Sequence, residues 1–185
     1  MQRGLERLYR LDPCADVEDF VTHAGEGRRE TLLVRESDEG LELRLCLPKL
    51  GEVGDGASFD PICQIIEGVS HFVYIADRAA QERETSQLEL EVQAEVDKYV
   101  VLASSLPSFD ERTSRRLRAQ LYDEVSFVHD EATEAGERYR LANAVARRFV
   151  TRLERDYLAR ARYGELQTEL RRFFHMGQGE KLRAA

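Results

Sequence analysis

The chain has 185 residues, 34% of them charged and 42% hydrophobic, which is typical of one globular domain with a real core. It contains no run of about 18 uncharged apolar residues, so the sequence predicts neither a membrane-spanning helix nor a membrane partner. The net charge of −8 makes nucleic acid an unlikely partner, because binding to phosphates needs a net positive field.

Residues 1–50 are expected to contain one helix and a β-hairpin. Asp12 and the proline after it are typical of a helix start, and apolar residues at helical spacing extend the predicted helix to Ala24. Two further runs, residues 31–35 and 41–47, flank a polar turn that contains a glycine. In the second run leucines alternate with other residues, as in a half-buried strand, so the two runs predict a hairpin.

Residues 58–106 are expected to form an αα-hairpin. An Asp-Pro pair at residue 60 opens a helix that is predicted to continue to about Arg83, with isoleucine, valine and phenylalanine side chains on one face. After a short polar loop, a second helix is predicted from about Gln87 to Ala103.

Residues 109–176 form a long helical region in which apolar or small residues recur at alternating spacings of four and three. This row, called the seam below, consists of Leu121, Val125, Val128, Ala132, Ala135, Tyr139, Ala142, Ala146, Phe149 and Leu153. Such spacing is typical of coiled-coil-like packing. We expect one continuous helix over residues 110–162. The alternative is a break at Gly136 with two helices packed within one chain, because glycine costs about 1 kcal/mol in a helix interior.

A continuous helix would span about 80 Å at 1.5 Å per residue, which is too long for one domain of this size to cover. The uncovered part of the seam predicts a homodimer, the commonest symmetric assembly. Residues 1–110 carry a net charge of −12 and residues 111–185 carry +4. Such a division indicates either an arginine-rich C-terminal half that binds nucleic acid or two halves that attract each other within or between chains, and the overall acidity favours the second. The expected partners are a second copy of the chain and, as an alternative, another protein.

These elements predict a single domain, residues 1–185, of the mainly α (α+β) class. It is a helical bundle with one long helix or two collinear helices and a small N-terminal β-hairpin. Residues 177–185 are expected to be a flexible tail. The cysteines, Cys14, Cys46 and Cys63, lack the spacing of a disulfide framework or a zinc site and indicate reduced thiols in a cytoplasmic protein.

Four side chains of the αα-hairpin form a candidate metal site. Glu67 and His71 lie four residues apart on one helical face, and Glu91 and Glu95 lie one turn apart on the next helix. Glu95 falls inside an apolar arc, where a carboxylate needs a cationic partner, a proton or a metal ion. If the hairpin brings the four together, they form an oxygen-and-imidazole site for a divalent metal ion inside a bundle.

The competing interpretation of the same residues is a buried ion pair of Glu95 with Arg78, Lys98 or an arginine of the long helix, and it is the favoured one. In that case no cofactor is expected. The glycine-rich segment 51–56 lacks the lysine of a phosphate-binding loop and is acidic, so it predicts a plain linker. Cys63 has no base within reach on its own helix, which favours a structural thiol.

Two functions follow from these observations. The first is a small cytoplasmic interaction or regulatory protein that acts as a homodimer, and this function is favoured over an enzymatic one. The alternative is a metal-binding helical-bundle enzyme or sensor that uses the Glu/His site.

Overall fold

The structure, a computed structural model, describes residues 1–23, 29–37, 40–48 and 59–185. The glycine-rich segment 51–56 therefore lies outside the described residues. The α-helices of the described part are α1 (Gln2–Tyr9), α2 (Phe59–Ala80), α3 (Gln87–Ser105), α4 (Glu111–Arg118), α5 (Glu134–Asp156), α6 (Tyr163–His175) and α7 (Gln178–Ala184). The strands are β1 (Val21–His23), β2 (Thr31–Ser37) and β3 (Gly40–Leu47), and the short helical turns are η1 (Val17–Phe20), η2 (Ala119–Asp123) and η3 (Leu158–Arg160). The predicted class, mainly α with a small β element near the N-terminus, is confirmed.

The small sheet has the strand order β1-β3-β2. β2 and β3 form the predicted antiparallel hairpin, with Leu32 opposite Leu45. β1 adds a parallel edge, with Val21 opposite Leu45, and the sequence did not predict this strand. Leu45 is buried between the sheet and α2, so the alternating leucines of β3 do mark the face that packs on the helices.

The predicted helix between residues 12 and 24 is wrong. Only the 3-10 turn η1 forms there, and the chain then enters β1, because pairing with β3 satisfies its backbone groups. The N-terminal helix is instead α1, in a polar segment with few apolar positions. Its Tyr9 is buried and stacks on Phe174 of α6, so packing against distant residues holds α1 in place.

The αα-hairpin of α2 and α3 is present close to its predicted limits. α3 begins where Ser86 accepts a hydrogen bond from the amide of Glu89, the arrangement of an N-cap. α2 ends at Ala80, earlier than predicted. Glu82 adopts a positive φ of 51°, and the amide of Arg83 donates back to the carbonyl of Arg78.

The single long helix expected over residues 110–162 is wrong. α4 continues into the π-helical turn η2, and residues 124–133 separate it from α5, which packs beside it. Thr133 caps α5 by accepting from the amide of Gly136. A Cβ atom at Gly136 would lie 1.8 Å from the carbonyl oxygen of Asp130, so only glycine permits this close approach of the preceding turn.

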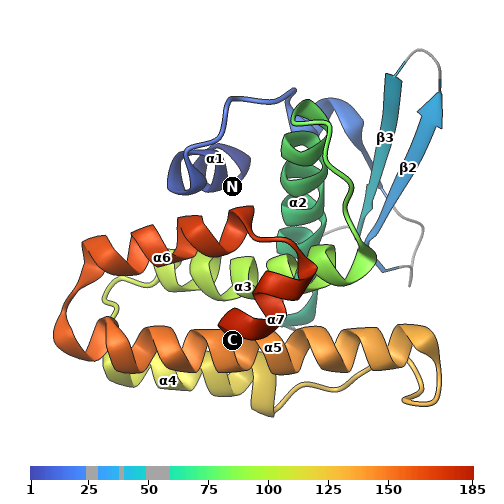
Figure 1. Ribbon diagram of the computed structural model, residues 1–185. Coiled ribbons are helices and arrows are strands. Elements are labelled where there is room, and N and C mark those ends of the chain that lie inside the picture. The colour runs from blue at the N-terminus through green and yellow to red at the C-terminus, as the bar shows by residue number, and fades with distance from the viewer. Residues whose placement is uncertain (24–28, 38–39, 49–58) are drawn as a thin grey trace.

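The end of the chain is also ordered, in contrast to the predicted flexible tail. α7 follows α6 directly, and its Lys181 is 1% exposed, with Nζ donating to the carbonyl of Phe173. In Figure 1, α3, α5 and α6 run across the view, whereas α2 stands at a steep angle to them. Strands β2 and β3 lie to the right of α2, on the side away from α1.

Much of the seam lies in the core of the same chain. Four of its C-terminal members are fully or almost fully buried, namely Ala142, Ala146, Phe149 and Leu153. By contrast Val128, in the segment before α5, is 65% exposed. Packing of α5 against α3 and α4 therefore covers the part of the seam that lies on α5. None of the described helices is long and apolar enough to cross a membrane.

Candidate metal centre

A cavity of about 1480 Å³ lies between α2, α3, strand β2 and the segment that leads to α5. Polar and apolar side chains from all of these elements line it. The predicted site residues Glu67, His71, Glu91 and Glu95 all line this cavity. The hairpin therefore brings the two helical faces together, as the spacing of these residues predicted.

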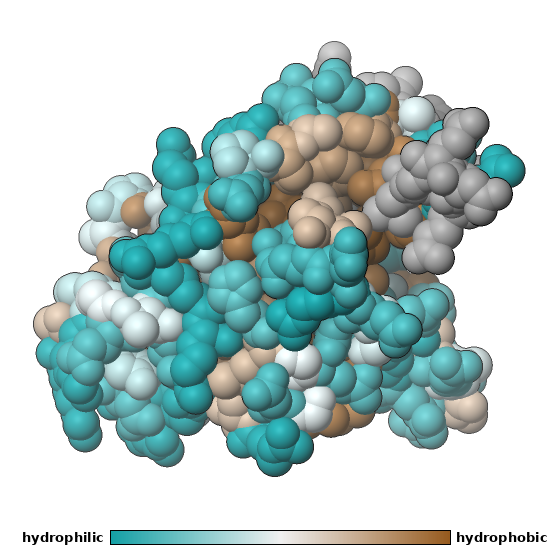
Figure 2. Space-filling view, turned by 45° about the horizontal axis from the view of Figure 1, so that its top comes forward, coloured by the Kyte–Doolittle hydropathy of each residue, from teal (hydrophilic) through white to brown (hydrophobic). Residues whose placement is uncertain are grey.

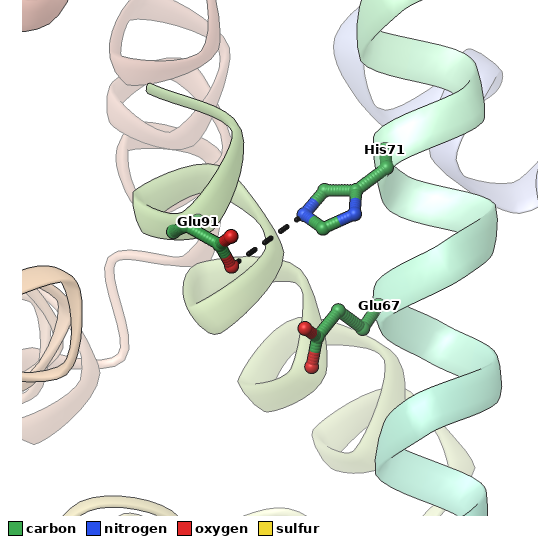
Figure 3. Close-up of side chains that lie close together, drawn as sticks. All are labelled: Glu67, His71 and Glu91. Carbon is green, nitrogen blue, oxygen red and sulfur yellow. Dashed lines mark ion pairs between the residues drawn. The ribbon is translucent and has the colours of Figure 1, made fainter. Parts of the chain in front are cut away.

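Three of the four predicted residues form one cluster. One ligand atom each from Glu67, His71 and Glu91 lies within 4.8 Å of the other two, and this is the one such group of three found in the described residues. Figure 3 shows that Glu67 and His71 project from one side of α2, toward Glu91 on α3. His71 and Glu91 are buried, and Glu67 is nearly so.

The two nitrogens of His71 face different carboxylates. Nε2 lies 3.8 Å from Glu91, along the dashed line in Figure 3, and Nδ1 lies 3.6 Å from Glu30, which directly precedes β2. Both distances are too long for hydrogen bonds. Nε2 of His71 and Oε1 of Glu30 are accordingly buried polar atoms without a hydrogen-bond partner. Such atoms are uncommon in native proteins and indicate a missing partner.

Glycine at residue 68 allows Glu30 to approach the cluster. A Cβ atom at Gly68 would lie 2.9 Å from Cγ of Glu30 and 2.8 Å from the side chains of Leu45 and Leu47. The sheet and the residue before β2 therefore sit directly on the backbone of α2, one residue after Glu67.

Glu95 does not belong to the cluster of three. It accepts a hydrogen bond from Nζ of Lys98 at 2.8 Å, and the same nitrogen donates to Glu67 at 2.9 Å. The predicted burial of Glu95 is confirmed, since its side chain is 14% exposed, and so is its pairing with a cation. Lys98 thus links Glu67 of the cluster to Glu95 through two short, charge-assisted hydrogen bonds.

Arg138 of α5 approaches the cluster from the opposite side. Its Nε lies 4.0 Å from Glu91 and is buried without a hydrogen-bond partner. Tyr139 is also close, and burial, followed by the charge of Glu91, raises the pKa of its hydroxyl. Glu91 therefore lies beside a histidine, an arginine and a tyrosine, and its distances to the histidine and the arginine, 3.8 and 4.0 Å, are longer than those of a close ion pair.

The charges of the cluster are strongly coupled. Although burial alone would favour neutral imidazole, the carboxylates of Glu30 and Glu91 raise the pKa of His71 to about 9. Burial raises the pKa of Glu91 to about 7, against the attraction of His71. Burial opposes the charged form of Lys98 too, but Glu95 and Glu67 outweigh it and raise the pKa of Lys98. Without an ion, the cluster is thus held by a protonated imidazole between two carboxylates.

The donor set suits a first-row divalent metal ion. One imidazole and two carboxylates are ligands that Mn²⁺, Fe²⁺ and Zn²⁺ accept. Two donor atoms of one such ion lie at most about 4.2 Å apart. The ligand atoms of the cluster lie within 4.8 Å of one another, so these distances need to shorten by only about half an ångström. A carboxylate on the second nitrogen of a ligating histidine, as Glu30 on His71, is the usual outer partner in metal sites.

Sequence reasoning missed Glu30 and Arg138. Glu30 lies at the start of a strand and Arg138 in the first part of a helix with many arginines, and no local pattern separates them from other charged residues. Cys63 also lines the cavity, where burial raises the pKa of its thiol to about 11. It is therefore protonated at neutral pH, and its structural role stays a prediction.

No family model matches the chain, and no curated protein or solved structure matches it either. The fold and the cluster define the protein as a mainly helical α+β domain with buried Glu and His side chains at the wall of a cavity. Its function has to be argued from these side chains.

Proposed function

We propose that this protein binds a first-row divalent metal ion through Glu67, His71 and Glu91 and works as a metal-dependent enzyme or sensor. The observation that carries the proposal is the Nε2 atom of His71. It is buried, has no hydrogen-bond partner, and faces Glu91 across a gap of 3.8 Å. A metal ion between these groups would satisfy the imidazole and both carboxylates at once.

The contrast with Lys98 supports an ion rather than a set of ion pairs. Lys98 contacts its two carboxylates at 2.8 and 2.9 Å, as stable buried pairs do. Around His71 and Arg138 the corresponding distances are 3.6 to 4.0 Å. A buried ion pair is stabilising only when its geometry is close and its remaining polar atoms are satisfied, and this side of the cluster meets neither condition.

Three protein donors leave coordination positions of a divalent ion open. In catalytic zinc sites such positions hold water or substrate, and the metal lowers the pKa of the water or polarises a carbonyl. In a sensor the same positions hold the molecule that is detected. The cavity beside the cluster provides room for either kind of ligand.

Metal content of the full-length chain tests this proposal. Protein purified without a metal-affinity tag is analysed for metals, stripped with a chelator, and titrated with Mn²⁺, Fe²⁺ and Zn²⁺ by calorimetry. We expect one ion per chain, with binding lost in His71→Ala and strongly weakened in Glu91→Gln and Glu67→Gln. Glu165→Gln, an exposed carboxylate of α6, is the matched control and should bind metal normally. A stripped wild-type protein that takes up none of the three ions would refute the proposal.

A second proposal is that the protein acts in the cytoplasm as a homodimeric interaction or regulatory protein. Exposed apolar side chains favour it: Leu33, Val34, Phe59 and Ile62 are all at least 38% exposed. Figure 2 shows apolar surface in the upper half of one face, beside the segments drawn in grey, while the lower half is mostly hydrophilic. The three cysteines are free, which suits a reducing compartment.

Light scattering at tens of micromolar separates a dimer from a monomer. A dimer that is disrupted by Leu33→Glu would support the interaction proposal, whereas a monomeric wild-type protein would exclude the homodimer. Neither result bears on the metal proposal, because the cluster is complete within one chain.

A further inference from the structure

Arg78 is a second buried charge that lines the cavity. It follows His71 by two helical turns of α2, about 10 Å along the helix axis. The residue is 2% exposed, although a guanidinium remains charged at every physiological pH. Its surroundings therefore have to supply either hydrogen-bond acceptors or a counter-ion.

Among the described residues, only one of the three guanidinium nitrogens of Arg78 has hydrogen-bond acceptors. Nη2 donates to the hydroxyl of Tyr74 and to the carbonyls of Phe174 and Met176, the latter two at 3.2 and 3.0 Å. These carbonyls belong to the end of α6, where backbone acceptors have no partner within the helix. A structural role in holding α6 against α2 thus explains Nη2.

The other two nitrogens are left without a partner. Nη1 and Nε of Arg78 are buried and donate to no acceptor among the described residues, which also provide no ion pair for this side chain. Nζ of Lys181 also lies near this site, 5.1 Å from the ring of Tyr74, while Cζ of Arg78 lies 4.7 Å from the same ring. A buried guanidinium without a counter-ion is costly, so Arg78 calls for an anion.

The turn after α2 adds two donors at this end of the cavity. The backbone bond from Arg83 to the carbonyl of Arg78 turns the chain back, so that Arg83 and Thr85 line the cavity. The hydroxyl of Thr85 is buried and has no hydrogen-bond partner. Two carboxylates lie nearby in the sequence, Asp77 and Glu84, and neither forms an ion pair with Arg78 among the described residues.

We propose that this end of the cavity binds the carboxylate or phosphate group of a small organic molecule, with Arg78 as the main donor and Arg83 and Thr85 beside it. The cavity continues along α2 to Glu67 and His71, so the ligand is an elongated anion whose far end reaches the Glu/His cluster. The anion subsite rests on Arg78, Arg83 and Thr85 and does not depend on a bound metal ion. The inference that the far end of the ligand reaches the Glu/His cluster rests on the proposed metal function.

Calorimetry on the full-length chain with simple probes tests both parts. The probes are inorganic phosphate and straight-chain dicarboxylates of increasing length, from succinate to azelate, added to the chelator-stripped and to the Mn²⁺-loaded protein. We expect the stripped protein to bind phosphate and the dicarboxylates with little dependence on length. In the loaded protein the longer dicarboxylates, whose ends are about 10 Å apart, should bind more tightly than succinate.

The variants assign the binding to this end of the cavity. Arg78→Lys keeps the charge but loses the fixed fork of donors, and we expect anions to bind about tenfold more weakly. Thr85→Val leaves the contacts between α2 and α6 intact, and Arg83→Gln removes only the 3.5 Å contacts of Arg83 with the carbonyl of His175. Each should weaken anion binding severalfold, which keeps the test decisive if Arg78→Lys does not fold. Arg155→Gln removes an exposed arginine that does not line the cavity and should change nothing.

The outcomes separate the two proposals. Anion binding that depends on Arg83 and Thr85 but is unaffected by Mn²⁺ would support the subsite and overturn the reach of the ligand to the cluster. Failure of the stripped protein to take up metal would refute the metal function itself. The subsite is overturned if the stripped and the loaded protein both bind no anion, or if Arg83→Gln and Thr85→Val bind anions as tightly as Arg155→Gln does.

Discussion

The Nδ1 atom of His71 faces Oε1 of Glu30 at 3.6 Å, although the two residues lie on different elements, α2 and the segment before β2. This pair gives the imidazole a fixed orientation, with Nε2 directed at Glu91. In metal sites a carboxylate behind the ligating histidine fixes its tautomer and raises its affinity for the metal.

We therefore expect Glu30→Gln to weaken metal binding about 10- to 100-fold without abolishing it. His71→Ala should abolish metal binding, because this variant removes a ligand, whereas Glu30→Gln removes only the group that orients the ligand. Calorimetric titration of both variants with Mn²⁺ and Zn²⁺ measures the difference. If Glu30→Gln binds metal as tightly as the wild-type protein, Glu30 does not act through His71.

Gly68 offers a way to move Glu30 without changing a charged group. In Gly68→Ala the new Cβ atom would lie within 3 Å of Glu30, Leu45 and Leu47. We expect the free energy of unfolding to fall by about 1–3 kcal/mol, as in other overpacked cores, and metal binding to weaken. Urea denaturation measures the first effect and calorimetry the second.

Gly164→Ala is the matched control for this substitution. Gly164 lies in the first turn of α6, and a Cβ atom there would meet nothing within 4 Å. This variant should keep or slightly increase the stability, because alanine loses less backbone entropy on folding. Equal destabilisation by the two substitutions would contradict the role given to Gly68.

The lowered pKa of Lys181 predicts that the free energy of unfolding rises at alkaline pH. Burial lowers its pKa to about 7, against the attraction of Asp97, while the unfolded chain keeps the ordinary value of 10.5. Between these values the unfolded state binds one more proton than the folded state, so the contribution of Lys181 to the free energy of unfolding increases with pH from about 7 to about 10. Below about pH 7 both states are protonated and the contribution is constant.

Lys181→Met isolates this contribution from the other titrating groups. We expect the difference in unfolding free energy, wild type minus variant, to rise across this pH range in urea denaturation experiments. A difference that stays constant or falls with pH would show that Lys181 remains charged in the folded protein. Its Nζ would then be held as an ammonium by Gln93 and the carbonyl of Phe173.

The buried part of the seam predicts the effect of a charge at Ala146. This residue is fully buried within one chain, so Ala146→Glu places a carboxylate in the core. We expect a loss of at least about 3 kcal/mol in unfolding free energy, independent of protein concentration. Arg148→Glu, at an exposed position of the same helix, should change the stability by less than about 0.5 kcal/mol. A destabilisation by Ala146→Glu that vanishes on dilution would place Ala146 in an interface between chains.

Local patterns in the sequence were sufficient for the elements that local interactions stabilise. Ser86 marks the start of α3, the alternating leucines mark β3, and the four-residue spacing of Glu67 and His71 places both on one face of α2. The burial of Glu95 and its partnership with a cation also follow from its place on a helical wheel. In each case residues within one or two turns, or one strand, determine the result.

Only the tertiary structure decided the rest, because contacts between distant residues outweigh local preference there. α1 forms in a polar segment since Tyr9 packs on Phe174, and the seam is interrupted since α5 turns back against α4. Glu30 reaches His71 through the packing of the sheet on α2. Periodicity describes which face of an element is apolar, but it does not say which distant backbone will cover that face or which buried polar atom will be left without a partner.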